Sequence, residues 1–318
     1  MGKNKTRPAD YRPLLQLYLR KNAEGGALLS PADIRTSADE LTRRECVVLV
    51  HGFNNTDSEA SEAYLGFRTR EKEIFSPADP QTFEHLFADA FWPGDADWWS
   101  FFDRADFLIY PAAVHTAVRA ARELANALWR MPNLETVDFI GHSLGSRVVL
   151  ETLLLLRARA MPRIRRVALM AAAVPSEMLE PRGRFYDLLI ALQGDGSTID
   201  ILHSKADTVL HYAFPPGQSL AGGREASERA LGRFGPSPLM PGYRANVSER
   251  EIGGAAHGDY WGHSKTASSR VATEEAGRFL RLGEFKREIG TVRVTGSSAA
   301  EIKARELGVT RTIGEIGY

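Results

Sequence analysis

Short apolar runs of strand length recur along the chain and are separated by longer amphipathic segments. A continuous apolar run of about four to eight residues is typical of a strand that is buried on both faces of a parallel sheet. The segment 46–50 is a run of this kind, and the largely apolar segments 137–140, 166–174 and 198–203 are also predicted as strands. A weaker extended pattern at 246–253 predicts a last strand, and the segment 14–19 predicts an edge strand.

Helical periodicity occupies much of the sequence between these runs. Helices are predicted at 58–70, 114–129, 146–160 and 269–282, where apolar residues fall on one face. Strands that alternate with helices favour an α/β fold with a mostly parallel central sheet and helices on both faces. The segments 74–104 and 214–244 are rich in proline and lack periodicity, so irregular cap-like insertions are predicted there.

The chain is predicted to divide into three parts. Residues 45–282 contain the strong strand and helix patterns and form one α/β domain. Residues 1–44 are an N-terminal extension and edge element, in which the polar stretch 31–44 forms a surface loop or a short helix. Residues 283–318 form a C-terminal tail or an added edge element.

Charge and cysteine content limit the possible partners and the cellular compartment of the protein. The 318 residues carry 40 basic and 40 acidic side chains, so no overall field favours nucleic acid. The single cysteine, Cys46, excludes an intrachain disulfide and fits a reducing compartment. The sequence shows neither an apolar run of membrane-spanning length nor a signal peptide. We expect a cytoplasmic protein with no transmembrane segment and no nucleic-acid partner, and the sequence indicates no protein partner.

The strongest candidate chemistry follows the apolar run 137–140. The sequence there reads GHSLG over residues 141–145 and leads at once into a Leu-rich helical segment. A G-x-S-x-G pattern between a strand and a helix is typical of a nucleophile elbow, in which the serine occupies a strained, tight turn. The flanking glycines leave room for the neighbouring chain. We therefore predict that Ser143 is a nucleophile.

A serine hydroxyl needs a base to accept its proton and a carboxylate to orient that base. Chains with this elbow carry the three groups in the order serine, acid, histidine. Asp207 lies just beyond the strand predicted at 198–203, downstream of Ser143, and is the predicted acid. Other acids near strand ends stay as alternatives, namely Glu177, Asp195 and Asp200.

Two late histidines compete for the role of base. His263 precedes the last predicted helix, where the base of this arrangement is expected to emerge, and it is the preferred candidate. His257 lies in the same loop and is the alternative base. His142 adjoins the nucleophile, but its side chain is expected to point away from that of Ser143, so a supporting role is predicted.

The oxyanion of acyl transfer needs two preorganised N–H donors. The backbone N–H of Leu144, the residue after the nucleophile, is one predicted donor. The second is the N–H of Phe53, which follows the strand 46–50 in the turn His51-Gly52-Phe53. No metal and no cofactor are predicted, and the sequence identifies no substrate-binding residue.

Five pieces of sequence within residues 45–282 form a pattern together: VVLVHGFNN, IGHSLGSRV, AAAVPSEM, SKADTVL and WGHSK. This pattern resembles the α/β-hydrolase superfamily, and more narrowly its bacterial esterase/lipase-like branch. The resemblance implies an α/β-hydrolase fold and a serine hydrolase that cleaves a small-molecule ester or acyl substrate through an acyl-enzyme. One departure is Ala173, because relatives carry an acidic residue ahead of Val-Pro, and this implies a different fine specificity.

Two further hypotheses belong to other functional classes. A catalytically silent hydrolase-fold protein that binds or scaffolds a partner, through the tail 290–318 for example, is the alternative to an enzyme. A nucleotide-binding α/β protein is disfavoured, because no G-x-G-x-x-G follows an early strand.

Overall fold

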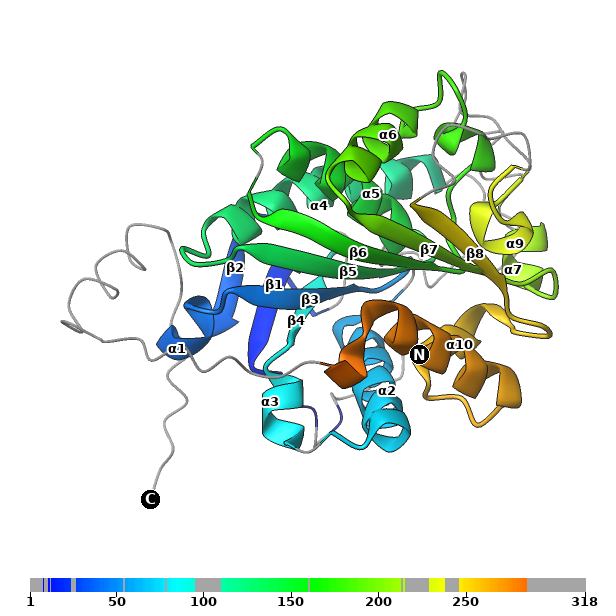
Figure 1. Ribbon diagram of the computed structural model, residues 1–318. Coiled ribbons are helices and arrows are strands. Elements are labelled where there is room, and N and C mark those ends of the chain that lie inside the picture. Colours follow the sequence, from blue (N-terminus) through cyan, green and yellow to red (C-terminus); the bar gives the residue numbers. More distant parts are fainter. Residues whose placement is uncertain are drawn as a thin grey trace.

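A computed structural model of the chain covers most of the predicted α/β region (Figure 1). The residues that it describes are 8, 11, 13–23, 27–53, 55–77, 79–94, 110–159, 161–212, 214, 229–237 and 246–284. The predicted tail beyond residue 284 and most of the insertion predicted at 214–244 lie outside these ranges.

Eight strands of the described region form one sheet, in the order β2-β1-β4-β3-β5-β6-β7-β8. Only β1 and β2 pair antiparallel, and the other six neighbouring pairs are parallel. The strands are β1 (Leu15–Arg20), β2 (Leu28–Thr36), β3 (Glu45–Val50), β4 (Phe87–Phe91), β5 (Thr136–His142), β6 (Arg163–Met170), β7 (Thr198–His203) and β8 (Val247–Glu251). The prediction of a mostly parallel sheet is confirmed.

Helices cover both faces of the sheet, as predicted. Figure 1 shows α4 (Tyr110–Trp129), α5 (Gly145–Arg157) and α6 (Tyr186–Gly194) on one face, and α2 (Asp57–Phe75) and α10 (Ala267–Leu280) on the other. Shorter helices are α1 (Ala38–Leu41), α3 (Pro80–Glu84), α7 (Thr208–Tyr212) and α9 (Leu231–Phe234), with the 3₁₀ helices η2 (Ser176–Leu179), η4 (His257–Trp261) and η5 (Leu282–Glu284). No helix in the described ranges is both long enough and apolar enough to cross a membrane.

The N-terminal region differs from the sequence prediction. β1 was expected at an edge, but it lies between β2 and β4, and β2 forms the edge instead. The polar stretch predicted as a loop or short helix at 31–44 contributes the second half of β2 before it reaches α1. Within that half, Ala32 and Ile34 are buried while Asp33 and Arg35 are partly exposed, which is the alternation of a strand with one covered face.

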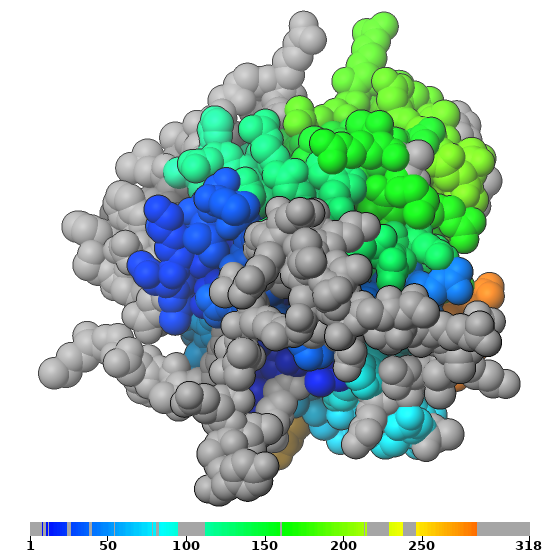
Figure 2. All heavy atoms as spheres, turned by 90° about the vertical axis from the view of Figure 1, so that its left-hand side faces the viewer, coloured from blue at the N-terminus to red at the C-terminus, as the bar shows by residue number. Residues whose placement is uncertain are grey.

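The N-terminal strands β1 and β2 pack against the rest of the α/β domain. Figure 2 shows them, in blue, against the blue-green surface of α4. The side chain of Glu123 on α4 accepts hydrogen bonds from Ser30 Oγ at 2.7 Å and from the backbone N–H of Ala32 at 3.3 Å. Both strands of the sheet that precede residue 45, β1 and β2, therefore lie in the part that the sequence predicted as an N-terminal extension and edge element.

The centre of the sheet has the composition that its position requires. In β3, the residues from Cys46 to Val50 are at most 1 % exposed, because a parallel strand between two layers of helices has no face in water. The parallel strands β3, β5, β6 and β7 end at the same edge of the sheet. The candidate serine and acid both follow strands that end there, and in such sheets ligands bind at this edge.

Candidate active site

Ser143 occupies the sharp turn between β5 and α5. Its φ of 52° is in the left-handed region, which costs free energy for any residue other than glycine. Its backbone N–H donates to the carbonyl of Met170 at 3.0 Å, which ties the turn to the end of β6. The local backbone therefore has the geometry of a nucleophile elbow.

The flanking glycines are required by close contacts. A Cβ placed on Gly145 would lie 2.2 Å from the carbonyl oxygen of His51, and one on Gly141 would lie 2.8 Å from the Cα of Ser146. Both separations are far shorter than real carbon contacts. The strand β5 and the helix α5 can therefore pack this closely to each other and to β3 only with glycine at both positions.

Three side chains from distant parts of the chain meet at this turn. The Oγ of Ser143 lies 2.9 Å from Nε2 of His257, and Nδ1 of His257 lies 2.7 Å from Oδ2 of Asp207. An ionised carboxylate only accepts hydrogen bonds, so Nδ1 carries the ring proton and Nε2 accepts from the serine hydroxyl. The arrangement is a continuous chain of hydrogen bonds from serine through histidine to aspartate.

The imidazole at this position belongs to His257 and not to His263, which was the preferred prediction. His257 opens η4 immediately above the elbow. Gly262, with φ of 74°, then turns the chain towards α2, where a Cβ on Gly66 would lie 2.8 Å from the Cβ of His263. The exposed His263 therefore packs beside α2, and the left-handed turn at Gly262 separates the two histidines.

Asp207 is completely buried in the turn between β7 and α7. Its second carboxylate oxygen, Oδ1, accepts a hydrogen bond of 2.9 Å from the backbone N–H of Leu210. With one oxygen on that N–H and the other on His257, the carboxylate is oriented and its burial is compensated. The sequence predicted Asp207 as the acid because it lies in a short polar turn directly after a strand.

The other candidate acids lie elsewhere. Asp200 is inside β7 and pairs with Arg250 at 2.8 Å, and Asp195 pairs with Arg157 at 2.8 Å on the surface. Glu177 lies on η2, where its backbone carbonyl accepts from the N–H of Glu180. In the described part of the chain, the carboxylate that binds His257 belongs to Asp207 and to none of these three residues.

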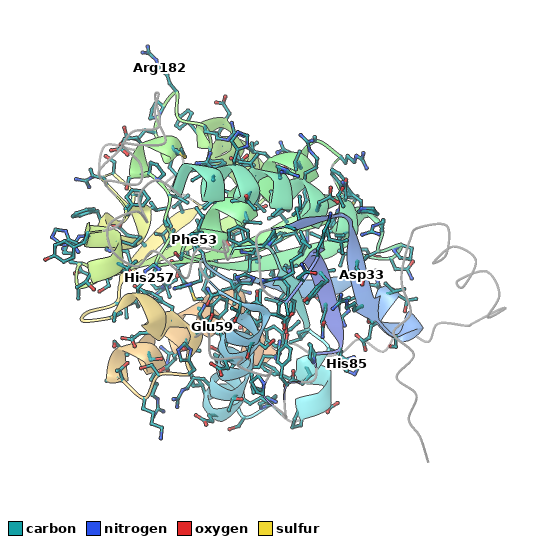
Figure 3. All side chains as sticks on the ribbon, turned by 180° about the vertical axis from the view of Figure 1, so that it is seen from behind. Asp33, Phe53, Glu59, His85, Arg182 and His257 are labelled. Atoms are coloured by element: carbon teal, nitrogen blue, oxygen red, sulfur yellow. The ribbon has the colours of Figure 1, made fainter. Side chains whose placement is uncertain are left out.

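The turn after β3 lies directly against the nucleophile. A Cβ on Gly52 would be 2.9 Å from the Cβ of Ser143, so only glycine permits the approach. Figure 3 places Phe53 and His257 in the same part of the molecule. The backbone N–H of Phe53 follows this contact, and the N–H of Leu144 immediately precedes α5. The two predicted oxyanion donors therefore belong to segments that meet at Ser143.

His51 holds this turn in place, a role that the sequence analysis did not assign to it. Its Nδ1 lies 2.9 Å from the carbonyl of Gly52, and its Nε2 accepts from the backbone N–H of Trp92 at 3.3 Å. The indole N–H of Trp92 donates in return to the carbonyl of His51 at 2.8 Å. Burial lowers the pKa of His51 to about 3, so the ring is neutral and its single N–H serves the Gly52 carbonyl.

Within the described ranges, no group of three or more His, Cys, Asp or Glu side chains has an arrangement that could hold a metal ion. The chemistry that the site can perform with its own groups is nucleophilic attack by Ser143 assisted by His257.

Comparison with protein families matches residues 31–213 to the family described as "Alpha/beta hydrolase of unknown function (DUF900)". The matched range covers more than half of the chain, contains Ser143 and Asp207, and ends before His257. Comparison with curated proteins gave no match.

Several solved structures are similar to this chain at low identity. The product of the gene lin2722 from Listeria innocua is 12% identical, with a TM-score of 0.44, over 77% of this chain and 96% of that one. Carboxyl esterase 2 from Tuber melanosporum is 12% identical, with a TM-score of 0.42, over 87% and 89%. The hyperthermophilic esterase from Pyrobaculum calidifontis is 15% identical, with a TM-score of 0.40, over 74% and 76%.

Proposed function

The chain belongs to this family of α/β hydrolases, and from that premise we propose that it is a serine hydrolase that cleaves carboxylic-ester-type bonds through an acyl-enzyme. The observation that carries the proposal is the pair of hydrogen bonds at His257, 2.9 Å to Ser143 and 2.7 Å to Asp207. Nucleophile, base and orienting acid are then in the relative positions that acyl transfer requires.

In the first half of the proposed reaction, Ser143 Oγ attacks the carbonyl carbon of the ester while His257 Nε2 accepts the hydroxyl proton. Asp207 stabilises the imidazolium that forms. The N–H groups of Phe53 and Leu144 donate to the oxyanion, and each such donor is typically worth about 3 kcal/mol in the transition state. The tetrahedral intermediate then expels the alcohol, which takes the proton from His257, and the acyl group remains on Ser143.

In the second half, a water molecule attacks the acyl-enzyme and gives a proton to His257 Nε2. Collapse of the second tetrahedral intermediate releases the carboxylic acid, and the proton returns to Ser143 Oγ. Water is the only co-reactant, and the enzyme is restored. Because Asp207 fixes Nδ1 as the protonated nitrogen, Nε2 is free to accept a proton at the start of each half.

The test of the proposal is covalent labelling with a fluorophosphonate probe. We expect the probe to label the wild type on Ser143 and to leave Ser143→Ala unlabelled, because the probe reacts with activated serine hydroxyls. Hydrolysis of p-nitrophenyl esters of increasing acyl length, measured on the same two proteins, then gives the size of the acyl group accepted.

Thermal unfolding of both proteins serves as the control for folding. A folded wild type that is neither labelled nor active on any ester of the series would contradict the proposal. That outcome would favour the alternative, a hydrolase-fold protein that binds a partner without catalysis.

A further inference from the structure

His142 is the last residue of β5 and directly precedes the nucleophile. Its side chain is buried, and its Nε2–H donates a hydrogen bond of 2.8 Å to the backbone carbonyl of His257. In the described part of the chain, no partner lies within hydrogen-bond distance of its other ring nitrogen, Nδ1. The ring therefore makes one directed hydrogen bond, and that bond ends on the residue that approaches Ser143.

The segment that carries His257 is anchored by the buried side chains of Tyr260 and Trp261, but its backbone is open at the glycines. A Cβ added to Gly253, Gly254 or Gly258 would find no atom within 4 Å. The turn is closed locally by Asp259, whose carboxylate accepts from the N–H of Ala256 at 2.9 Å. Because glycines in open surroundings do not restrict the backbone, the buried side chains fix the segment as a whole, and the hydrogen bond from His142 acts on the backbone of His257 itself.

The His142 ring contacts the other parts of the site as well. Its centroid lies 4.9 Å from that of His257, and the rings of Tyr260 and Trp261 lie 6.2 Å and 5.8 Å away. On the other side, a Cβ on Gly52 would lie 3.1 Å from Nδ1 of His142. The ring thus fills the space between the segment that carries His257 and the turn that carries Phe53.

We propose that His142 is a positioning residue, whose Nε2–H holds the backbone of His257 so that the imidazole of His257 stays aligned with Ser143 and Asp207. This inference rests on the proposed serine-hydrolase function. His142 touches neither the substrate nor the reacting atoms, and it acts only through the carbonyl of His257.

A neutral His142 ring also avoids repulsion with the positive charge that forms on His257 in the proposed reaction. Burial, and then the neighbouring His257, His263 and His51, together lower the pKa of His142 to about 3. In the proposed reaction His257 becomes cationic, and a second cation at a ring separation of 4.9 Å would oppose that step. A neutral ring donates its one hydrogen bond without this repulsion.

A matched pair of variants separates the hydrogen bond from simple filling of space. His142→Gln retains an N–H donor at the position of Nε2, whereas His142→Met has a similar length and no donor. We expect His142→Met to lower kcat for a p-nitrophenyl ester by roughly 10- to 100-fold with KM unchanged, because a small displacement of the base costs this much. We expect His142→Gln to remain within about threefold of the wild type, because its donor preserves the bond.

Equal activity of His142→Met and the wild type would overturn the inference. An equal loss in both variants would also overturn it, because the donor would then not be the cause. Gly258→Ala, which meets no neighbour, serves as a control for substitution close to His257. Thermal unfolding of each variant checks that it is folded.

A second measurement does not require activity. In NMR spectra of protein labelled with nitrogen-15 histidine, we expect His142 to remain in the neutral Nε2–H form from about pH 8 to about pH 5. The neutral Nδ1–H form, in which Nε2 has no proton to donate to the carbonyl of His257, would overturn the inference. A wild type that fluorophosphonate does not label would instead contradict the proposed function. The NMR spectra would still show whether Nε2 of His142 carries the proton that it donates to His257.

Discussion

At the scale of single residues, the choice between two histidines in one loop depends on where each side chain finds partners. His257 has a hydrogen-bond partner on each ring nitrogen, Ser143 and Asp207. His263 lies beyond the left-handed turn at Gly262 and is exposed beside α2. A ring held on both nitrogens has a fixed tautomer, which a general base requires.

Substitution of the two histidines tests this difference directly. We expect His257→Ala to lower kcat for a p-nitrophenyl ester on the order of 10⁴-fold or more, because no other group in the described site can accept the proton of Ser143. His263→Ala is the matched control, and we expect it to remain within about threefold of the wild type, as exposed substitutions usually do. A larger loss from His263→Ala than from His257→Ala would show that the assignment of the base is wrong.

At the scale of elements, the site depends on how closely a strand and a helix pack across the elbow. β5 enters the turn, α5 leaves it, and β3 passes so near that the carbonyl of His51 occupies the space where a side chain at Gly145 would lie. His51 and Trp92 then connect the end of β3 to the end of β4. The nucleophile and the proposed oxyanion donors are thus attached to one rigid edge of the sheet.

Gly145→Ala is the substitution that tests this packing. The added methyl group forces the backbone at the start of α5 away from β3, so we expect a loss of about 1–3 kcal/mol in the free energy of unfolding, together with slower labelling of Ser143. Urea unfolding and the rate of fluorophosphonate labelling measure the two effects. Gly258→Ala makes the same chemical change in open space, and an equal loss in both variants would contradict the argument.

At the scale of the whole molecule, one buried acid links stability to pH. Glu71 on α2 lies in the contact with α10, where its Oε2 would be 1.9 Å from a Cβ on Gly277. Neither carboxylate oxygen of Glu71 has a hydrogen-bond partner among the described residues. Burial, and then the charge of Glu274, raise the pKa of Glu71 well above its usual value of 4.5. The folded protein therefore keeps Glu71 protonated at pH values where the unfolded chain releases the proton.

This linkage predicts a pH-dependent effect of Glu71→Gln on stability. Above pH 4.5 the unfolded wild type binds fewer protons than the folded state, so the wild type loses stability as pH rises until Glu71 ionises in the folded state. Glutamine cannot ionise. The free energy of unfolding of Glu71→Gln, relative to that of the wild type, should therefore increase by up to about 1.4 kcal/mol per pH unit in that range.

Urea unfolding of the wild type and Glu71→Gln between about pH 4 and about pH 8 measures the effect. Glu62→Gln, on the exposed face of the same helix, is the control for the loss of one carboxylate from α2. A constant difference between Glu71→Gln and the wild type at every pH would mean that Glu71 is not protonated in the folded protein.

The sequence by itself determined the features that lie within one continuous segment. The apolar run at 46–50 and the largely apolar segment 198–203 specify buried strands, because a strand without a wet face is built mainly from apolar residues. The pattern GHSLG specifies the elbow, because the strained turn and its close neighbours require a small set of residues at fixed spacing. The sequence also predicted the turn at Gly52, because a glycine directly after a buried strand permits a close approach of the backbone.

The tertiary structure alone decided which distant groups meet. His257 is 114 residues from Ser143 and 50 residues from Asp207, and its choice over His263 depends on a turn whose direction the sequence pattern does not reveal. The position of β1 inside the sheet depends on a partner strand, β2, in which polar and apolar residues are mixed. The contact of His142 with the carbonyl of His257 spans 115 residues. Such contacts depend on the relative placement of whole elements, which is set by packing over the entire sheet and not by the residues beside each group.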